Sequence, residues 1–268
     1  MKVLFLGDIV GPSGCAAVKK YLKKVINENR IDFVIANGEN AAENGVGITK
    51  DILNDLISLG INVLTTGNHV WDHKEAMTLV EEDERLLRPL NLVGISPGKG
   101  FNIYKTSNNL KVGVLNLMGN IFMKKCENVF KAAENFQKKY KLKKDYDYLV
   151  VDIHSETTSE KMAMGYFFDG KATLVTGTHT HIPTNDFRVM SGGTAYITDS
   201  GMCGDYDSVI GMNKENSLKR FLKDNSQKNH PSLGDASLSG VIVDCDEITG
   251  LAKNIESLIV GGVLKNSK

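Results

Sequence analysis

Short apolar runs alternate with amphipathic segments along the first third of the chain. Residues 2–6, 32–36 and 61–65 are rich in β-branched and other apolar side chains, and each run stops at polar residues or glycine. Between these runs, apolar positions recur at helical spacing in residues 13–29 and again after Thr49, which is placed to cap its helix. Strands that alternate with helices in this way predict parallel βαβ units.

The pattern changes after Pro89, where predicted strands follow one another more closely. A lysine-rich segment at 124–140 is predicted to be a helix with a solvated face, and the polar residues 213–231 are predicted to form an exposed helix and loop. No internal repeat, low-complexity tract or linker interrupts the sequence, so we expect one domain spanning residues 1–268. The strands expected in this part are 91–95, 101–105, 111–117, 146–153, 172–176, 194–198, 240–244 and 252–260.

The composition is that of an ordinary globular protein and excludes disordered and fibrous classes. Of the 268 residues, 41% are hydrophobic and 24% are charged, which is enough to build a sizeable core. The 32 basic and 32 acidic side chains cancel, which argues against a binder of long nucleic acids but leaves a small nucleotide open. Lysine outnumbers arginine 27 to 5, so very few arginines are available to clamp a phosphate.

Nothing in the sequence predicts export or a membrane partner. The apolar run after Met1 is too short for a secretory leader, and no window approaches the ~20 apolar residues that span a bilayer. The cysteines lie far apart and form no CxxC pair, which is typical of free thiols in a cytoplasmic protein. We therefore expect a cytoplasmic protein, and the sequence leaves open whether it forms a homo-oligomer.

Side chains that can bind metal ions come directly after successive predicted strands. In open α/β sheets, the carboxyl ends of the strands are where ligands bind. Taken singly, Asp8 and Glu39 have a plainer interpretation as helix caps, and His154 as a core histidine. Their shared position favours a single site, which the following residues build: Asp8, Glu39, Asn68 with His69, His154, and His179 with His181.

The pair His179 and His181 is the most specific of these indications of a metal site. Residues two apart in an extended segment project to the same side, ~6.5–7 Å apart, so both imidazoles can point into one site. This spacing suits two metal ions ~3.5–4 Å apart, and we expect Thr178 and Thr180 to point the other way. Imidazole, carboxylate and amide donors without a thiolate favour iron, manganese or zinc.

A two-metal centre needs a bridging ligand and a source of protons. Glu39 is the natural bridging candidate, because a carboxylate centred among the other donors can contact both ions. His69 is predicted to donate a proton to the leaving group, since Asn68 can hold a metal while His69 stays free to titrate. Glu156 is a candidate to orient His154, with surface or capping use as the alternative.

In these motifs the chain resembles the calcineurin-like metallophosphoesterases, most closely their bacterial YmdB-type branch. The resemblance implies a four-layer α/β/β/α sandwich of two mixed sheets flanked by helices. It extends over most of the chain, in segments 6–11, 37–42, 66–72, 154–161, 177–181, 194–199 and 206–212.

The resemblance also implies a site, with His69 matching the proton donor of the superfamily. Two departures from the wider superfamily stand out: Asp8 is not followed by the usual histidine ligand, for which Asn40 substitutes, and the usual bridging aspartate is Glu39. The implied ions are iron or manganese, with zinc as an alternative. They would be held by two sets that share Glu39: Asp8, Glu39, Asn40 and His181, and Glu39, Asn68, His154 and His179.

Relatives in this branch are phosphodiesterases of cyclic nucleotides. We therefore expect a dinuclear-metal phosphodiesterase acting on 2′,3′-cyclic nucleotides, with 3′,5′-cyclic nucleotides left open. A metal-dependent phosphomonoesterase is one alternative, and a non-catalytic protein that senses a nucleotide or metal is another. A nuclease on long RNA or DNA would need a continuous basic track, which the charge balance disfavours.

Overall fold

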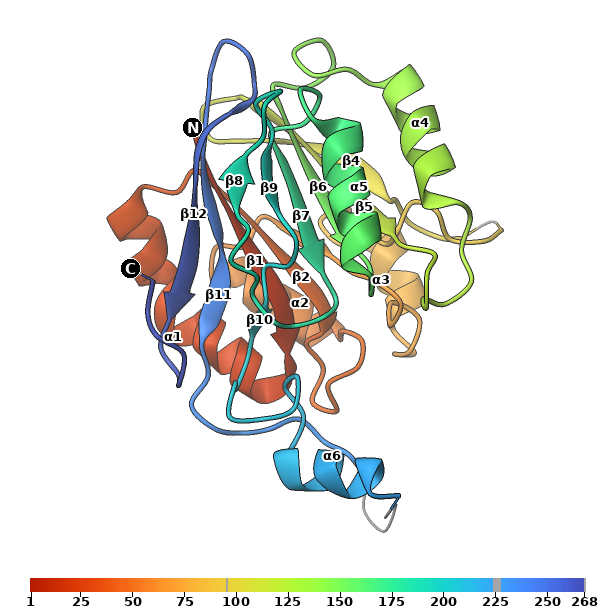
Figure 1. Cartoon of the computed structure of the whole chain (residues 1–268), viewed down its shortest axis with the longest axis vertical. Coiled ribbons are helices and arrows are strands. Elements are labelled where there is room, and N and C mark those ends of the chain that lie inside the picture. The colour runs from red at the N-terminus through yellow and green to blue at the C-terminus, as the bar shows by residue number, and fades with distance from the viewer. Residues whose placement is uncertain (95, 224–227, 268) are drawn as a thin grey trace.

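The strands of the protein form two mixed sheets, seen in the computed structural model, which describes residues 1–94, 96–223 and 228–267 (Figure 1). In the first sheet the order is β12-β11-β1-β2-β3, and β10 pairs with the end of β1. Strands β2 and β10 run parallel to β1, whereas β11 is antiparallel to both β1 and β12. The bounds are β1 (Lys2–Val10), β2 (Phe33–Asn40), β3 (Val63–Thr65), β10 (Met202–Cys203), β11 (Leu238–Cys245) and β12 (Ala252–Val260).

The second sheet has the order β4-β5-β6-β7-β9-β8. Its four central strands are parallel, and the two edge strands are antiparallel to their neighbours. The bounds are β4 (Phe101–Lys105), β5 (Lys111–Met118), β6 (Tyr148–His154), β7 (Leu174–Thr178), β8 (Arg188–Val189) and β9 (Ala195–Ile197).

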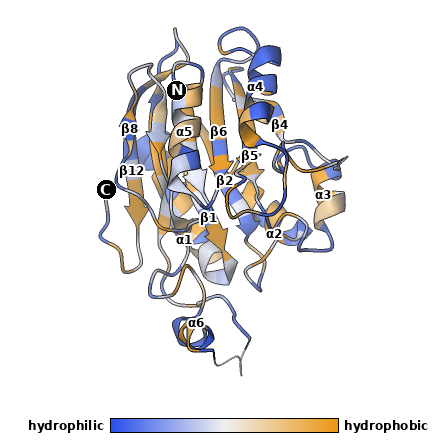
Figure 2. Cartoon of the chain, turned by 45° about the vertical axis from the view of Figure 1, so that its right-hand side comes forward, coloured by the Kyte–Doolittle hydropathy of each residue, from blue (hydrophilic) through white to orange (hydrophobic). Residues whose placement is uncertain are grey.

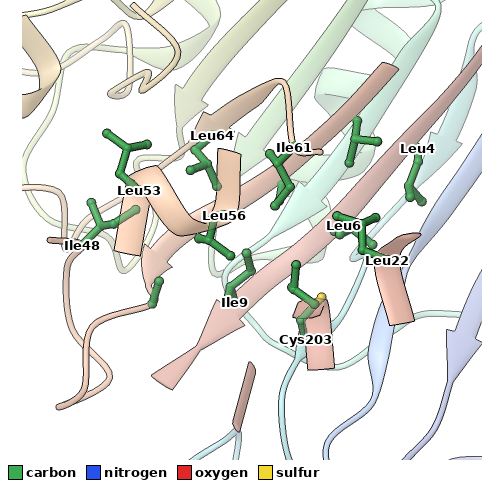
Figure 3. Packing of buried hydrophobic residues seen from close by; sticks show 14 of the residues in the cluster. Leu4, Leu6, Ile9, Leu22, Ile48, Leu53, Leu56, Ile61, Leu64 and Cys203 are labelled. Carbon is green, nitrogen blue, oxygen red and sulfur yellow. The ribbon is translucent and has the colours of Figure 1, made fainter. Parts of the chain in front are cut away.

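Alternate residues of β1 face different cores, because successive side chains of a strand point to opposite faces. Val3 and Phe5 are buried against residues of the second sheet, such as Val150. Leu4 and Leu6 pack on the other face against helices α1 (Gly11–Asn29) and α2 (Lys50–Ser58), as Figure 3 shows for part of this cluster. The first sheet therefore lies between the second sheet and a layer of helices.

The second sheet has the same arrangement on its outer face. Leu149 and Val151 pack there against α4 (Val129–Lys139) and α5 (Thr158–Phe168). In Figure 2 the strands are largely hydrophobic, whereas α4 presents a hydrophilic surface. The four layers confirm the predicted α/β/β/α sandwich. Two short helices complete the described part of the chain, α3 (Ala76–Glu82) and α6 (Lys214–Phe221), and α6 projects from the body at the lower end in Figure 1.

Two of the predicted elements differ most from the structure, and the bounds of several others are shifted by a few residues. Helix α4 begins only after Asn128, whose side chain accepts a hydrogen bond from the backbone N–H of Lys131 and caps the helix. Residues 91–94 form no strand: Leu92 makes only an isolated antiparallel bridge with Cys126, and the side chain of Asn91 bonds both backbone groups of Met118. The last residue of that prediction, Ile95, lies outside the described residues, as do 224–227 of the predicted polar loop.

Two further expectations agree with the structure. The side chain of Thr49 accepts a hydrogen bond from the backbone N–H of Ile52 and caps α2 as predicted. The cysteines are free thiols. Within the described ranges, no helix combines the length and the apolar character that crossing a bilayer requires.

Candidate metal centre

Polar side chains from both sheets meet at the carboxyl ends of the parallel strands. Asp8 and Glu39 come from β1 and β2 of the first sheet, and His154 is the last residue of β6 in the second. His179 follows β7 directly. One ligand atom each from Glu39, His154 and His179 lies within 4.8 Å of the others, so these three side chains can hold one ion.

The four residues expected around one metal are brought together. The Nε2 atom of His154 lies 2.8 Å from Glu39 Oε1, 3.1 Å from Asn68 Oδ1 and 3.1 Å from His179 Nδ1. Both His154 and Glu39 are buried. Two imidazole nitrogens, a carboxylate and an amide oxygen thus converge on one point, which is a donor set suited to iron, manganese or zinc.

The second expected set lies beside the first and includes oxygens that lack a partner. Asp8 Oδ1 lies 3.9 Å from both His181 Nε2 and His154 Nδ1. Among the described residues, Asp8 Oδ1 and Asn40 Oδ1 are buried and accept no hydrogen bond. A buried carboxylate or amide oxygen without a partner is costly, and a bound cation would satisfy it. The residues present therefore fit a metal ion at this position too.

The turn that carries His179 and His181 is not extended, so that part of the sequence prediction is wrong. Both residues have a positive φ, 97° at His179 and 64° at His181. The Nδ1 atom of His181 contacts the carbonyl oxygen of Ile210 at 2.8 Å, which leaves Nε2 on the side of Asp8. The two imidazoles reach one site through left-handed backbone conformations, not through strand alternation.

The neighbours of this turn also differ from expectation. Glu156 does not contact His154; its Oε2 lies 3.0 Å from Nε2 of His179 and so orients that ring. Thr178, expected to point away, places its Oγ1 2.8 Å from His154 Nδ1. Thr180 turns to Asp199 instead.

A buried polar network behind His154 was missed by the sequence analysis. The hydroxyl of Thr178 donates to Asp152 Oδ1 at 2.7 Å, so Nδ1 of His154 must donate to that hydroxyl. Asp152 also accepts from Asn37 Nδ2 and from the hydroxyl of Thr65. This network holds the His154 tautomer in which Nε2 is the ligand atom. The sequence does contain an indication of this network, because Asp152 is a charged residue inside the apolar run 148–153.

The charges of these residues depend on one another. Burial raises the pKa of Glu39, but the charge of His154 and its hydrogen bond outweigh burial and lower that pKa to about 2. Burial lowers the pKa of His154, yet the charge of Glu39 outweighs it and raises this pKa to about 9. Burial, followed by the charge of His154, lowers the pKa of His179 to about 3. Without metal, a proton therefore lies between Glu39 and His154, while His179 offers a neutral nitrogen.

His69 stands at the rim of this centre. Its backbone N–H donates to Glu39 Oε2 at 3.0 Å, and its Nδ1 lies 2.7 Å from Asp72 Oδ2. Lys124 donates to both oxygens of Asp72, at 2.9 and 3.0 Å. The Asp72 carboxylate fixes the orientation of the His69 ring.

A cleft of about 1040 Å³ opens over the centre. Glu39, His69 and His179 line its inner end, and residues of α6, including Arg220 and Phe221, line another part. The cleft is of the size that holds small-molecule ligands in proteins.

A four-layer sandwich with imidazole, carboxylate and amide donors at the carboxyl ends of both sheets defines a phosphoesterase of the metallophosphoesterase type. Membership of this type implies that divalent metal ions are bound, which agrees with the imidazole, carboxylate and amide donors found here. The family model described as "YmdB-like protein" matches residues 4–258, and the chain belongs to that family.

Individual relatives agree with this assignment. A 2′,3′-cyclic-nucleotide 2′-phosphodiesterase of Bacillus subtilis (strain 168) is 40% identical over 260 residues, which cover 97% of each chain. The crystal structure of a novel phosphatase from Mycoplasma pneumoniae superposes with a TM-score of 0.89 at 35% identity, covering 97% of this chain and 93% of that one. A hypothetical protein from Thermus thermophilus has a TM-score of 0.90 at 37% identity, covering 98% of this chain and 100% of that one. The chain is thus a hydrolase of phosphoric esters.

Proposed function

We propose that the protein is a dinuclear-metal phosphodiesterase that hydrolyses 2′,3′-cyclic nucleotides. The observation that carries the proposal is the pair of buried, unpartnered oxygens, Asp8 Oδ1 and Asn40 Oδ1, beside the cluster of Glu39, His154 and His179. The named activity of the Bacillus subtilis relative supports the choice of substrate. The ligands would be Asp8, Glu39, Asn40, Asn68, His154, His179 and His181, with Glu39 between the two ions.

The metals would be iron or manganese. The proposed ligands mix imidazole with carboxylate and amide oxygen and include no thiolate, which is the donor type these ions accept, as does zinc. When bound, the ions would supply positive charge toward the phosphate oxygens and acidify a water molecule at neutral pH.

The residues of the chain would perform the remaining tasks. His69 would donate a proton to the ribose oxygen that leaves phosphorus, because its ring lines the cleft next to the proposed ligands. Asp72 would hold Nδ1 of His69 and fix the orientation of its ring, which leaves Nε2 to face the substrate. A non-catalytic sensor of nucleotide or metal has no need of such an Asp-supported histidine, so these two residues favour the enzyme.

The test is hydrolysis by metal-free protein reloaded with Mn²⁺, and with Fe²⁺ under anaerobic conditions. Substrates are 2′,3′-cyclic AMP, 3′,5′-cyclic AMP, a bis-aryl phosphodiester and the matching aryl monoester. We expect 2′,3′-cyclic AMP to be cleaved and the monoester to be cleaved far more slowly. The variant His69→Ala should keep its metal and lose about 100-fold or more in turnover, whereas Glu39→Gln should lose both metal and activity.

Two outcomes would redirect the proposal. Preference for the monoester would identify a phosphomonoesterase. Full metal occupancy without cleavage of any ester would identify the sensing protein instead. The exposed carboxylate Glu43, in the loop that follows β2, supplies the matched control: Glu43→Gln should leave metal content and rate unchanged.

A further inference from the structure

We propose that the buried ion pair Lys161–Asp199 is a positioning pair that holds the His179–His181 turn and Asp8 in the arrangement that binds metal. The inference rests on the metal centre proposed above and assigns a role to two residues outside its ligand set. Neither residue lines the cleft among the described residues, so the pair acts through other groups.

The pair is fully buried although both members are charged. Lys161 Nζ lies 2.7 Å from Asp199 Oδ2, and both side chains have an exposed fraction of 0%. Lys161 belongs to α5, and its aliphatic stem passes over β7 at Gly177, where a Cβ atom would lie 2.7 Å from Lys161 Cδ. Apolar residues of similar volume usually fill such a position at a lower desolvation cost. We therefore expect these two buried charges to have a specific structural role.

One task is to hold the turn that carries two proposed ligands. Asp199 Oδ2 accepts hydrogen bonds from the backbone N–H of Thr180 at 3.2 Å and from its hydroxyl at 2.7 Å. Thr180 lies between His179 and His181, which adopt φ values of 97° and 64°. Left-handed conformations are costly for residues with a Cβ atom, and they persist where surrounding contacts impose them. The charged acceptor at Thr180 supplies such a contact.

The same carboxylate also reaches the first sheet. Asp199 Oδ1 accepts from the backbone N–H of Gly201 at 2.8 Å, and the Gly201 carbonyl accepts from the backbone N–H of Asp8 at 3.1 Å. The backbone N–H of His179 in turn donates to Asp8 Oδ2 at 3.1 Å. Asp199 thus connects proposed ligands from the two sheets. Lys161 supplies the opposite charge that holds its carboxylate in place.

The test measures Mn²⁺ affinity by calorimetry and thermal stability without metal for the full chain and three variants. Lys161→Met/Asp199→Leu replaces the pair with apolar groups of similar shape. Thr180→Val removes one hydroxyl bond to Asp199 and retains the branched side chain. The control is Thr173→Val just before β7, away from the turn, where the lost hydroxyl donates to the Gly250 carbonyl and accepts from the backbone N–H of Leu149.

We expect Mn²⁺ affinity to fall about tenfold or more in the double variant and about threefold or more in Thr180→Val, because a hydrogen bond to a charged group is lost. Thr173→Val should lower the melting temperature and leave the affinity within about twofold of the parent. If the double variant does not fold, Thr180→Val still decides the matter. Unchanged affinity in Thr180→Val, or an equal loss in Thr173→Val, would overturn the positioning role. Failure of the parent chain itself to bind Mn²⁺ would instead reject the metal centre.

Discussion

The Nε2 atom of His154 lies 2.8 Å from Oε1 of Glu39, with both side chains buried, at the point where a metal ion is expected. This contact links the two sheets, because Glu39 belongs to β2 of the first sheet and His154 to β6 of the second. Because the pKa of His154 is raised to about 9, we expect a proton to lie between these two side chains when no metal is bound. Loading the centre must therefore displace that proton.

Mn²⁺ binding should become tighter as the pH rises. The pKa of His154 is raised to about 9, so its ring is charged below that pH and must lose a proton to bind metal. Between pH 7.5 and 8.5 unperturbed histidines are already neutral, so a change in this window reports His154. We expect affinity to rise up to about tenfold per pH unit there, with proton release seen by calorimetry in two buffers of different ionisation heat. Equal affinity at both pH values, without proton release, would contradict this assignment.

The clustering of the proposed ligand residues could be predicted from the sequence, because residue types that bind metals stand at the ends of predicted strands. Asp8, Glu39 and His154 each stand at the end of an apolar run, and parallel strands bring such ends to one edge. The backbone of the His179–His181 turn could not be predicted in this way. Its left-handed conformation depends on contacts with residues distant in sequence, such as Asp199 and Ile210, which no local pattern reveals.

The layered fold was predicted through family resemblance more than through periodicity. Strand β1 is apolar at Val3, Leu4, Phe5 and Leu6 alike, so alternation does not indicate which face meets the second sheet. Likewise, the start of α4 was placed too early, because the capping role of Asn128 is only one of several interpretations of a polar residue in a lysine-rich stretch.

Gly67 leaves the space in which His154 and Glu39 meet. A Cβ atom there would lie 2.1 Å from His154 Cδ2 and 2.5 Å from Glu39 Oε2, which real contacts do not allow. We therefore expect Gly67→Ala to push these two proposed ligands apart and to weaken Mn²⁺ binding about tenfold or more. Gly204→Ala is the matched control, because its nearest neighbour is the flexible Met202 side chain at 3.3 Å. Full metal affinity in Gly67→Ala would show that this contact is not part of the site.

Asp72→Asn should slow hydrolysis without loss of metal. Asp72 contacts Nδ1 of His69 and lies outside the proposed ligand set, so we expect its loss to affect proton donation by His69 and not metal binding. We expect about a tenfold to 100-fold loss with 2′,3′-cyclic AMP, whose leaving ribose oxygen needs a proton, and a smaller loss with the bis-aryl diester. Asp83→Asn is the control, since Asp83 pairs with Arg85. Equal losses with both substrates would mean that Asp72 does not act through proton donation.

Phe221 presents an aromatic ring at the part of the cleft lined by α6, where we expect the base of a nucleotide substrate to stack. Its side chain is 79% exposed although it lines the cleft that contains Glu39 and His179, so its ring is accessible to a ligand. Stacking of a base on an aromatic ring contributes about 1–3 kcal/mol. We expect Phe221→Ala to raise KM for 2′,3′-cyclic AMP by about fivefold or more with kcat little changed. Cyclic ethylene phosphate, which has no base, should show no change.

The neighbouring residue provides the control for this prediction. Leu222 is equally exposed, at 80%, and is not among the described residues that line the cleft. Leu222→Ala should therefore leave KM unchanged for both substrates. If Phe221→Ala and Leu222→Ala raise KM alike, the effect reflects a disturbed α6, not stacking. If neither changes KM for 2′,3′-cyclic AMP, the base does not bind against this helix, and recognition must come from the inner end of the cleft.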